Sequence, residues 1–345
     1  VLVIQAGLFV ACIPVTRVFK SLLGLAALGG IGMIVVMINV FGYELVRMGL
    51  AGRMATPDFW MVTGISAGVG VTLFGLMYML SVALISPPSA NRALPVRLYF
   101  TVMWLAWGIA LSWIAVREHT AEIMNAWLIP GSLLVAAALY VCLGEDPAWS
   151  SRVRRSIPRL TLFRIPAFLF FNGPAGGIVW AGLLAAATVA WTRCAERAIE
   201  PVPSRDNLEI LGTFTGGLLY VFAFGLFSLL VWRVLLRNVL PRAAVWVGAL
   251  LLIAAGSILP VLADLGMGNL GDKSIGAWQF GNIFSLADDK TRNLQILYAA
   301  SCALVALTGN LLWIIRQARD FRPLKPAAGP GADAAPAADP GTQAP

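Results

Sequence analysis

The sequence has few charged residues, one histidine and only four cysteines. Charged residues make up 12% of its 345 positions, whereas about a quarter of a typical soluble domain is charged. Hydrophobic residues make up 59%, and the mean hydropathy is +0.81. This composition excludes a soluble globular protein and predicts an integral protein of a lipid bilayer. The formal net charge is +8, but the basic residues lie in short connections between apolar runs, so we expect no nucleic-acid partner.

The cysteine pattern also lacks the spacings of common disulfide and metal sites. Cys12, Cys142, Cys194 and Cys302 are far apart in the chain, so neither a disulfide framework nor a set of metal ligands is visible. The paired aspartate motifs that hold magnesium diphosphate are missing too. We therefore expect no metal, no cofactor and no catalytic activity of the chain's own.

A nucleotide-binding loop is also missing. Residues 266–274 resemble a phosphate-binding loop, in which a glycine and four further residues precede Gly-Lys-Ser. However, Asp272 is inserted before Lys273 and would place a carboxylate where the phosphates bind. No predicted strand precedes this segment. Any ATP-driven activity therefore needs a partner subunit.

Glycine spacing predicts close helix packing in the third apolar run. Gly64 and Gly68 enclose Ser66 in a pattern similar to a nucleophile elbow, but a serine nucleophile needs a base. The single histidine, His119, lies in a separate short connection. The same glycines form Gly-x-x-x-Gly, the spacing that lets two helices approach closely. We favour this packing interpretation.

The same spacing recurs in the sixth apolar run. Gly173 and Gly177 are four residues apart, and Asn172 and Pro174 flank the first of them. Because proline interrupts helical hydrogen bonding, this segment predicts a kinked, closely packed sixth span.

Long apolar runs dominate the rest of the chain. A spanning helix needs about 20 mostly apolar residues, and nine runs qualify as candidates. They cover residues 1–15, 21–41, 59–84, 98–116, 123–143, 166–191, 209–232, 243–263 and 294–315. The first run is short and has no basic segment before it, so we expect a missing or processed N-terminal piece rather than a signal peptide. The predicted fold is all-α: a polytopic transmembrane helix bundle over residues 1–325, with nine spans, or eight if the first run is incomplete.

The distribution of lysine and arginine predicts the orientation of this bundle. The connections after the first, third, fifth and seventh spans, together with the C-terminal segment, hold 16 of the 25 basic residues. The positive-inside rule places these segments in the cytoplasm. We therefore predict a multi-pass protein of a bacterial cytoplasmic (inner) membrane with its C-terminus inside. Residues 326–345 are mostly Ala, Pro, Gly and Asp and form a predicted disordered cytoplasmic tail.

The most basic segment lies between the fifth and sixth predicted spans. Its five arginines fall within thirteen residues and are Arg152, Arg154, Arg155, Arg159 and Arg164. Asp146 followed by Pro147 predicts a helix start, because aspartate caps helices and proline suits their first position. The helix should end before Pro158, and Trp149 and Val153 should share one of its faces. We predict a short amphipathic helix along the cytoplasmic membrane surface; a plain stop-transfer cluster of charges is an equal alternative.

Residues 85–97 and 149–159, together with the aromatic loop before the last span, carry a family resemblance. They resemble segments of the permease subunits of bacterial type-2 ABC exporters. The resemblance implies a permease without an ATP site, whose short cytoplasmic helices dock on a separate ATPase subunit. The docking candidates are Trp149, Arg152, Arg154, Arg155, Arg159, Asn91 and Arg92.

The leading expectation is therefore the permease subunit of an ATP-driven transporter, in a homo- or hetero-oligomer. Two alternatives stay open. A membrane-embedded lipid-processing enzyme could use Glu118, His119 and Glu122, or a loop that carries Asp264 and Asp272. A structural or assembly subunit could use the basic helix as a platform for acidic lipid or for a partner.

Overall fold

The computed structural model describes residues 57–87, 89–200, 204–240, 242, 244–266 and 281–324. The first two predicted spans, the predicted disordered tail and loop residues 267–280 lie outside these ranges. Every regular element within them is a helix, and seven of these helices are long and apolar enough to cross a membrane. The prediction of an all-α, multi-pass membrane bundle is therefore confirmed.

The seven candidate spans match the third to the ninth apolar runs. They are α4 (Pro57–Ile85), α5 (Ala93–Arg117), α6 (Asn125–Leu143), α9 (Pro174–Ile199), α10 (Arg205–Val231), α11 (Ala244–Gly266) and α12 (Asp289–Asp320). A 3-10 helix, Ala121–Met124, leads into α6, and the π-helical segment Trp232–Leu236 extends α10. The shorter elements are α7 (Ser151–Ser156), α8 (Thr161–Phe170) and a 3-10 helix, Ile283–Ala287.

The predicted kinked sixth span is wrong in form, because the chain breaks there into two helices. Helix α8 ends at Phe170 and α9 begins at Pro174. Gly173, the residue before α9, has φ +137°, a backbone conformation that glycine alone adopts without strain. Proline then occupies the first helical position, which its fixed φ favours. The result is a separate ten-residue helix before a full-length span.

Helices α5 and α12 each begin five residues earlier than their apolar runs predict. Helix α5 starts at Ala93 rather than at residue 98, and this brings Arg97 inside the helix. Helix α12 starts at Asp289 rather than at residue 294, after an Asp288 cap that accepts the Lys290 N–H at 3.2 Å. The charge of Arg97 near the start of α5, and the polar residues 289–293 at the start of α12, hid both starts from a criterion based on hydropathy.

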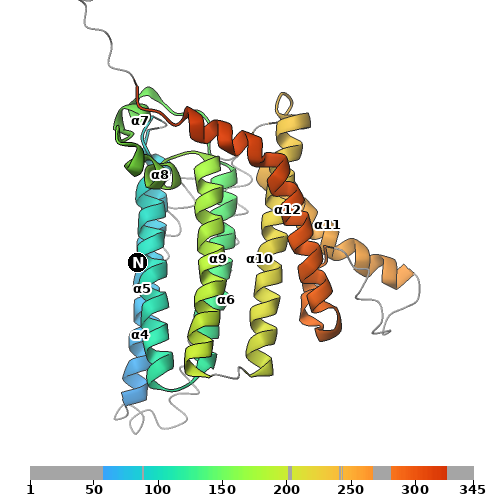
Figure 1. Ribbon diagram of the computed structural model, residues 1–345. Coiled ribbons are helices and arrows are strands. Elements are labelled where there is room, and N and C mark those ends of the chain that lie inside the picture. Colours follow the sequence, from blue (N-terminus) through green and yellow to red (C-terminus); the bar gives the residue numbers. More distant parts are fainter. Residues whose placement is uncertain are drawn as a thin grey trace, which may run out of the picture.

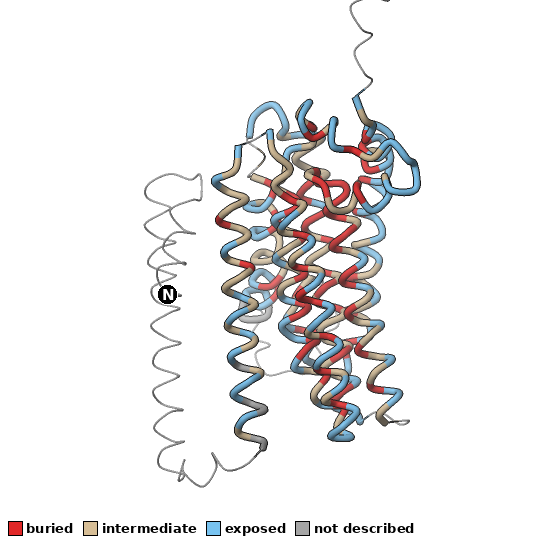
Figure 2. Tube along the Cα trace, turned by 90° about the vertical axis from the view of Figure 1, so that its left-hand side faces the viewer, coloured by how far each residue is buried: buried red, intermediate tan, exposed pale blue. Residues whose placement is uncertain are grey.

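Packing places α6, α9 and α10 in the centre of the bundle. Helix α12 packs along α10, α4 packs against α5, and α11 also packs against α10 (Figure 1). Buried positions concentrate on the inner helices, whereas the outer helix faces carry intermediate and exposed residues (Figure 2). In the apolar stretch of α4 only 11% of the residues are buried, and in that of α11 only 17%. Since both stretches are apolar, their exposed faces suit acyl chains.

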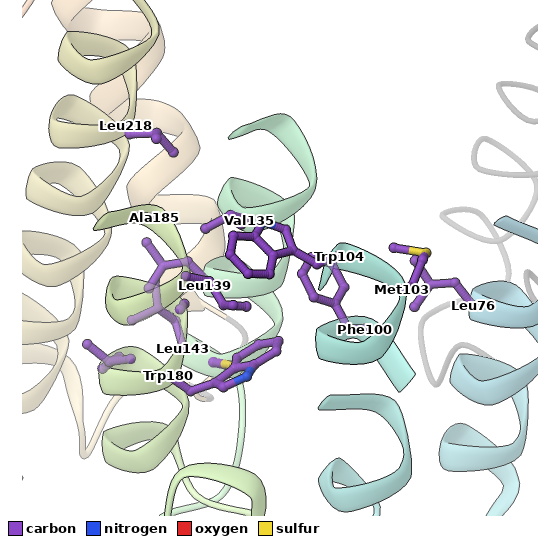
Figure 3. Packing of buried hydrophobic residues seen from close by; sticks show 14 of the residues in the cluster. Leu76, Phe100, Met103, Trp104, Val135, Leu139, Leu143, Trp180, Ala185 and Leu218 are labelled. Atoms are coloured by element: carbon purple, nitrogen blue, oxygen red, sulfur yellow. The ribbon is translucent and has the colours of Figure 1, made fainter. Parts of the chain in front are cut away.

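Large aromatic side chains fill the core between the inner spans. Trp104 of α5 points toward α6, and Trp180 of α9 lies below it (Figure 3). The rings of Trp104, Trp127 and Trp191 contact one another with centroids 5.2 to 5.6 Å apart. The Trp104 indole N–H donates to the Thr188 hydroxyl at 3.0 Å. This buried indole N–H therefore has a hydrogen-bond acceptor inside the bundle.

One end of the bundle collects most of the positive charge, and we call it the basic end. Here α4, α6, α10 and α12 finish, α5, α9 and α11 begin, and α7 and α8 lie (Figure 1). Of the 19 basic residues in the described ranges, 13 belong to this end. Because charge and short helices gather at the same place, the basic end is the candidate functional site.

Candidate functional site

A buried arginine holds the basic end together. Arg97, in α5, is 2% exposed, and its Nη2 donates to Glu145 Oε1 at 2.6 Å. Its Nη1 donates to the carbonyls of Leu169 at 2.7 Å and Phe171 at 2.8 Å. Nη2 also approaches the Gly173 carbonyl at 3.2 Å. One guanidinium therefore joins α5 to the loop after α6 and to the break between α8 and α9.

Glu145 completes this contact from the other side. Its second oxygen, Oε2, accepts the Gly173 N–H at 2.6 Å, so both carboxylate oxygens are engaged. Burial raises the pKa of Glu145 above its ordinary value, while Arg97 and the Gly173 N–H oppose that shift. The Arg97–Glu145 ion pair therefore positions these segments, and each buried charge needs the other as its counter-charge.

A second, half-buried cation lies near the same carboxylate. The Nε of Arg242 donates to the Leu143 carbonyl at 3.2 Å, and its guanidinium lies 5.4 Å from the Trp232 ring centroid. Desolvation lowers the pKa of Arg242 to about 10, although Asp146 and Glu145 act in the opposite direction. Arg242 thus stays charged at neutral pH and extends the contact toward α11.

Asn172 connects the break before α9 to two other segments. Its Oδ1 accepts the Ala93 N–H at 2.6 Å, and its Nδ2 donates to the Ala90 carbonyl at 2.9 Å. Its backbone N–H donates to Asn91 Oδ1 at 3.0 Å, and its carbonyl accepts the Trp149 indole N–H at 2.6 Å. The start of α5, the break before α9 and the segment before α7 are therefore fixed relative to one another.

An aromatic cluster attaches α7 to the end of α12. Phe321 lies 5.3 Å from Trp149, 5.6 Å from Phe168 and 5.7 Å from Phe171, measured between ring centroids. Val153 of α7 is buried in the same cluster. Because Phe321 follows α12 directly, the buried face of α7 packs on a continuation of the last span.

The start of the predicted amphipathic helix is wrong, although its end is confirmed. Helix α7 begins at Ser151, and the Ser150 hydroxyl accepts the Val153 N–H at 3.2 Å as its cap. The Asp146 carboxylate instead accepts the Ala148 N–H at 2.9 Å, closing a local turn. The helix ends before Pro158. Trp149 precedes α7, yet it shares the buried cluster with Val153, and both pack on protein.

The five predicted docking residues of the basic segment separate into three groups. Arg152, Arg155 and Arg159 are exposed, and none of them forms a hydrogen bond or ion pair through its side chain to a described residue. Arg154 is half-buried and faces the end of α12. Trp149 is buried in the aromatic cluster and is not available for direct contact.

The two other docking candidates lie in the connection before α5. The Asn91 side chain is engaged with the backbone of Asn172. Arg92 donates from Nη2 to the Ser86 carbonyl and from Nε to the Pro87 carbonyl at 3.3 Å. Both side chains therefore shape this connection internally.

The four glycines predicted to mediate helix packing have different surroundings. An added Cβ at Gly64 would meet no described atom within 4 Å, and one at Gly68 would lie 3.1 Å from the Trp107 ring. At Gly173 it would approach the Trp149 indole nitrogen at 3.1 Å. At Gly177 it would lie 2.5 Å from Arg97 Nη2 and 2.6 Å from the sulfur of Cys142. Of these four glycines, Gly177 therefore has the closest neighbours. There α9 lies against Arg97 of α5 and Cys142 of α6.

Replacing Gly177 with alanine should lower the melting temperature of the purified protein. The new methyl group would displace Arg97 or Cys142, at a cost of about 1–3 kcal/mol. Gly217→Ala is the matched control, because an added Cβ there meets no described atom within 4 Å. Thermal unfolding in detergent, followed by tryptophan fluorescence, measures both. Equal melting temperatures for the two variants would contradict the close approach at Gly177.

The residues considered for a lipid-processing enzyme do not form a site among the described side chains. Glu118, His119 and Glu122 are all exposed at the end opposite the basic end, and His119 has φ +52°. The Asp264 side chain and Asp272 lie outside the described part. In the ranges that the structure describes, no group of three or more His, Cys, Asp or Glu residues could hold a metal ion.

No family model, curated protein or solved structure matches the chain.

Arg97, Glu145 and Asn172 were not predicted from the sequence as site residues. The sequence pattern indicates that Arg97 lies in a loop, because a charged residue usually marks the end of an apolar run. One signal was available: Pro95 fits the first turn of a helix and indicates a start before residue 97. The partners of Arg97 are 48 to 76 positions away in the chain, and a local pattern cannot indicate them.

Proposed function

We propose that the chain is the membrane-spanning subunit of an ABC-type transporter that a separate ATPase drives. In this proposal the basic end faces the cytoplasm of a bacterial cell, and α7 is the contact for the ATPase. The observation that carries the proposal is the two-sided nature of α7. Its outer face carries exposed arginines that form no ion pair with a described residue. Its inner face packs against residues that adjoin several spans.

Charge supports the orientation. The basic end carries 13 of the 19 basic residues in the described part of the chain. Lys and Arg in short connections favour the cytoplasmic side. A soluble ATPase would therefore meet Arg152, Arg155 and Arg159 at the exposed end of the bundle.

The contacts of α7 support a role in transmitting motion. Its buried face packs on Phe321 after α12, and Trp149 bonds to Asn172 ahead of α9. The Ser150 hydroxyl donates to the Ser89 carbonyl at 2.7 Å, in the connection between α4 and α5. A displacement of α7 would therefore act on three spans at once. Packed elements of this kind can pass on discrete movements.

Reversing two exposed charges on α7 tests the docking proposal. In the variant Arg152→Glu, Arg155→Glu, the ATP hydrolysis that co-purifies with the chain from its own membranes should fall about tenfold or more. The new glutamates would repel the acidic groups of a partner surface that is complementary to arginine. The matched control is Arg237→Glu, Arg316→Glu, which changes the net charge equally at exposed positions of the same end. The control should retain the ATPase.

Three outcomes would count against this proposal. Retention of the ATPase by the α7 variant would exclude docking through these arginines. Recovery of a partner without ATP hydrolysis would favour an assembly role instead. Lipid turnover by the purified chain alone, abolished in His119→Ala, would favour an enzyme.

A further inference from the structure

Three arginines converge on an open cleft between α7 and the end of α12. The cleft has a volume of about 440 Å³, and it is lined by Arg154, Arg319, Asp320 and Arg322. The Leu324 N–H donates to the Arg154 carbonyl at 3.4 Å and joins the two walls. Residues more than 160 positions apart thus form one concave surface.

The cleft carries more positive charge than its own groups neutralise. None of its arginines forms an ion pair with another described residue. Arg154 Nε is shielded from solvent and has no hydrogen-bond partner among the described residues. Asp320 and the negative C-terminal end of α12 offset only part of three positive charges, because a helix end corresponds to about half a charge. An anion bound in the cleft would supply what is missing.

The neighbouring helix indicates the depth of the cleft in the bilayer. Helix α8 exposes Leu162, Phe163 and Ile165 at 76%, 56% and 67%, and it lies beside α7 at the basic end (Figure 1). Large apolar side chains on a short surface helix belong at the boundary between headgroups and acyl chains. Phe321, which lies between Arg319 and Arg322 in the chain, contacts the Phe168 ring of α8. We therefore infer that the cleft arginines lie at the level of lipid phosphates.

We propose that this cleft binds the phosphate-bearing headgroup of an anionic membrane lipid. Guanidinium groups donate paired hydrogen bonds that match phosphate oxygens, and basic pockets at the membrane surface suit anionic headgroups. The site uses Arg154, Arg319 and Arg322, whereas the proposed ATPase contact uses Arg152 and Arg155. The two proposals can therefore fail independently.

Lipid titration of the purified, full-length protein tests the site. Phosphatidylglycerol added to the detergent-solubilised protein should raise its melting temperature, and phosphatidylcholine should not. The variant Arg319→Gln, Arg322→Gln should need about tenfold or more phosphatidylglycerol for half of the shift, because each basic residue near an anionic surface contributes measurably. Arg319→Lys, Arg322→Lys keeps the charge without the paired donors and should weaken binding less.

The control variant Arg237→Gln, Arg316→Gln removes the same charge from exposed positions at the same end. It should titrate as the unmodified protein does. Equal weakening in this control, or none in the cleft variants, would overturn a specific site. A full shift with inorganic phosphate alone, with no further effect of lipid, would overturn the lipid assignment in favour of a soluble phosphate compound. If the glutamine variant does not fold, the lysine variant and the control decide between these results.

Discussion

The variant Glu145→Gln is expected to destabilise the basic end by about 3 kcal/mol, because removal of one member of a buried ion pair leaves the other without its counter-charge. Arg97 would remain 2% exposed and would keep only carbonyl acceptors. Hydrogen exchange should show loss of protection in residues 89–93 and 171–177, and the melting temperature should fall.

An exposed ion pair provides the control for Glu145. Arg117 and Glu118 approach at 3.7 Å with side chains 65% and 46% exposed, and pairs of this kind contribute little. Glu118→Gln should therefore leave exchange and melting nearly unchanged. Arg97→Met combined with Glu145→Gln should recover part of the lost stability, since it removes both charges. If Glu145→Gln behaves like Glu118→Gln, the buried pair does not hold the basic end together.

Trp149→Ala is expected to release α7 while the spans stay folded. Trp149 is 8% exposed, stacks edge-on against Phe321 and donates its indole N–H to the Asn172 carbonyl at 2.6 Å. Loss of a buried tryptophan costs about 3–5 kcal/mol, and here the loss falls on the contacts between α7 and the spans. Amide protection of residues 151–157 should disappear. In the proposed transporter, ATP hydrolysis would continue without transport.

Two matched tryptophan variants make this expectation specific. Trp149→Phe keeps the ring contact with Phe321 but loses the indole N–H, so it should cost less than Trp149→Ala. Trp113→Ala removes a tryptophan that is 62% exposed and should leave α7 protected. Persistent protection of residues 151–157 in Trp149→Ala would show that α7 is held by other contacts.

The seven described spans were predictable because each must present about 20 apolar residues to the bilayer. The break before α9 was not predictable as a break. Gly173 and Pro174 indicate an interruption, but its form depends on a φ of +137° and on bonds that Gly173 makes with Arg97 and Glu145. Those partners come from distant segments. Local sequence therefore locates the interruption without giving its geometry.

The basic segment illustrates the same limit at the site. Both Asp146 and Ser150 are good capping residues, and only the packing of Trp149 and Val153 against Phe321 selects the later start. The arginines were recognisable as a group. Three of them face outward, whereas Arg154 lines the cleft, and this separation depends on where α12 ends, about 160 residues later in the chain.

Photo-crosslinking from Arg155 tests the central claim most directly. A photo-reactive amino acid placed at Arg155 in the full-length chain, in intact cells, should form an adduct with a protein that binds and hydrolyses ATP. The same group placed at Glu118, at the opposite end of the bundle, should not. Identical adducts from both positions, or a partner at Arg155 without ATPase activity, would contradict a cytoplasmic ATPase docked on the basic end.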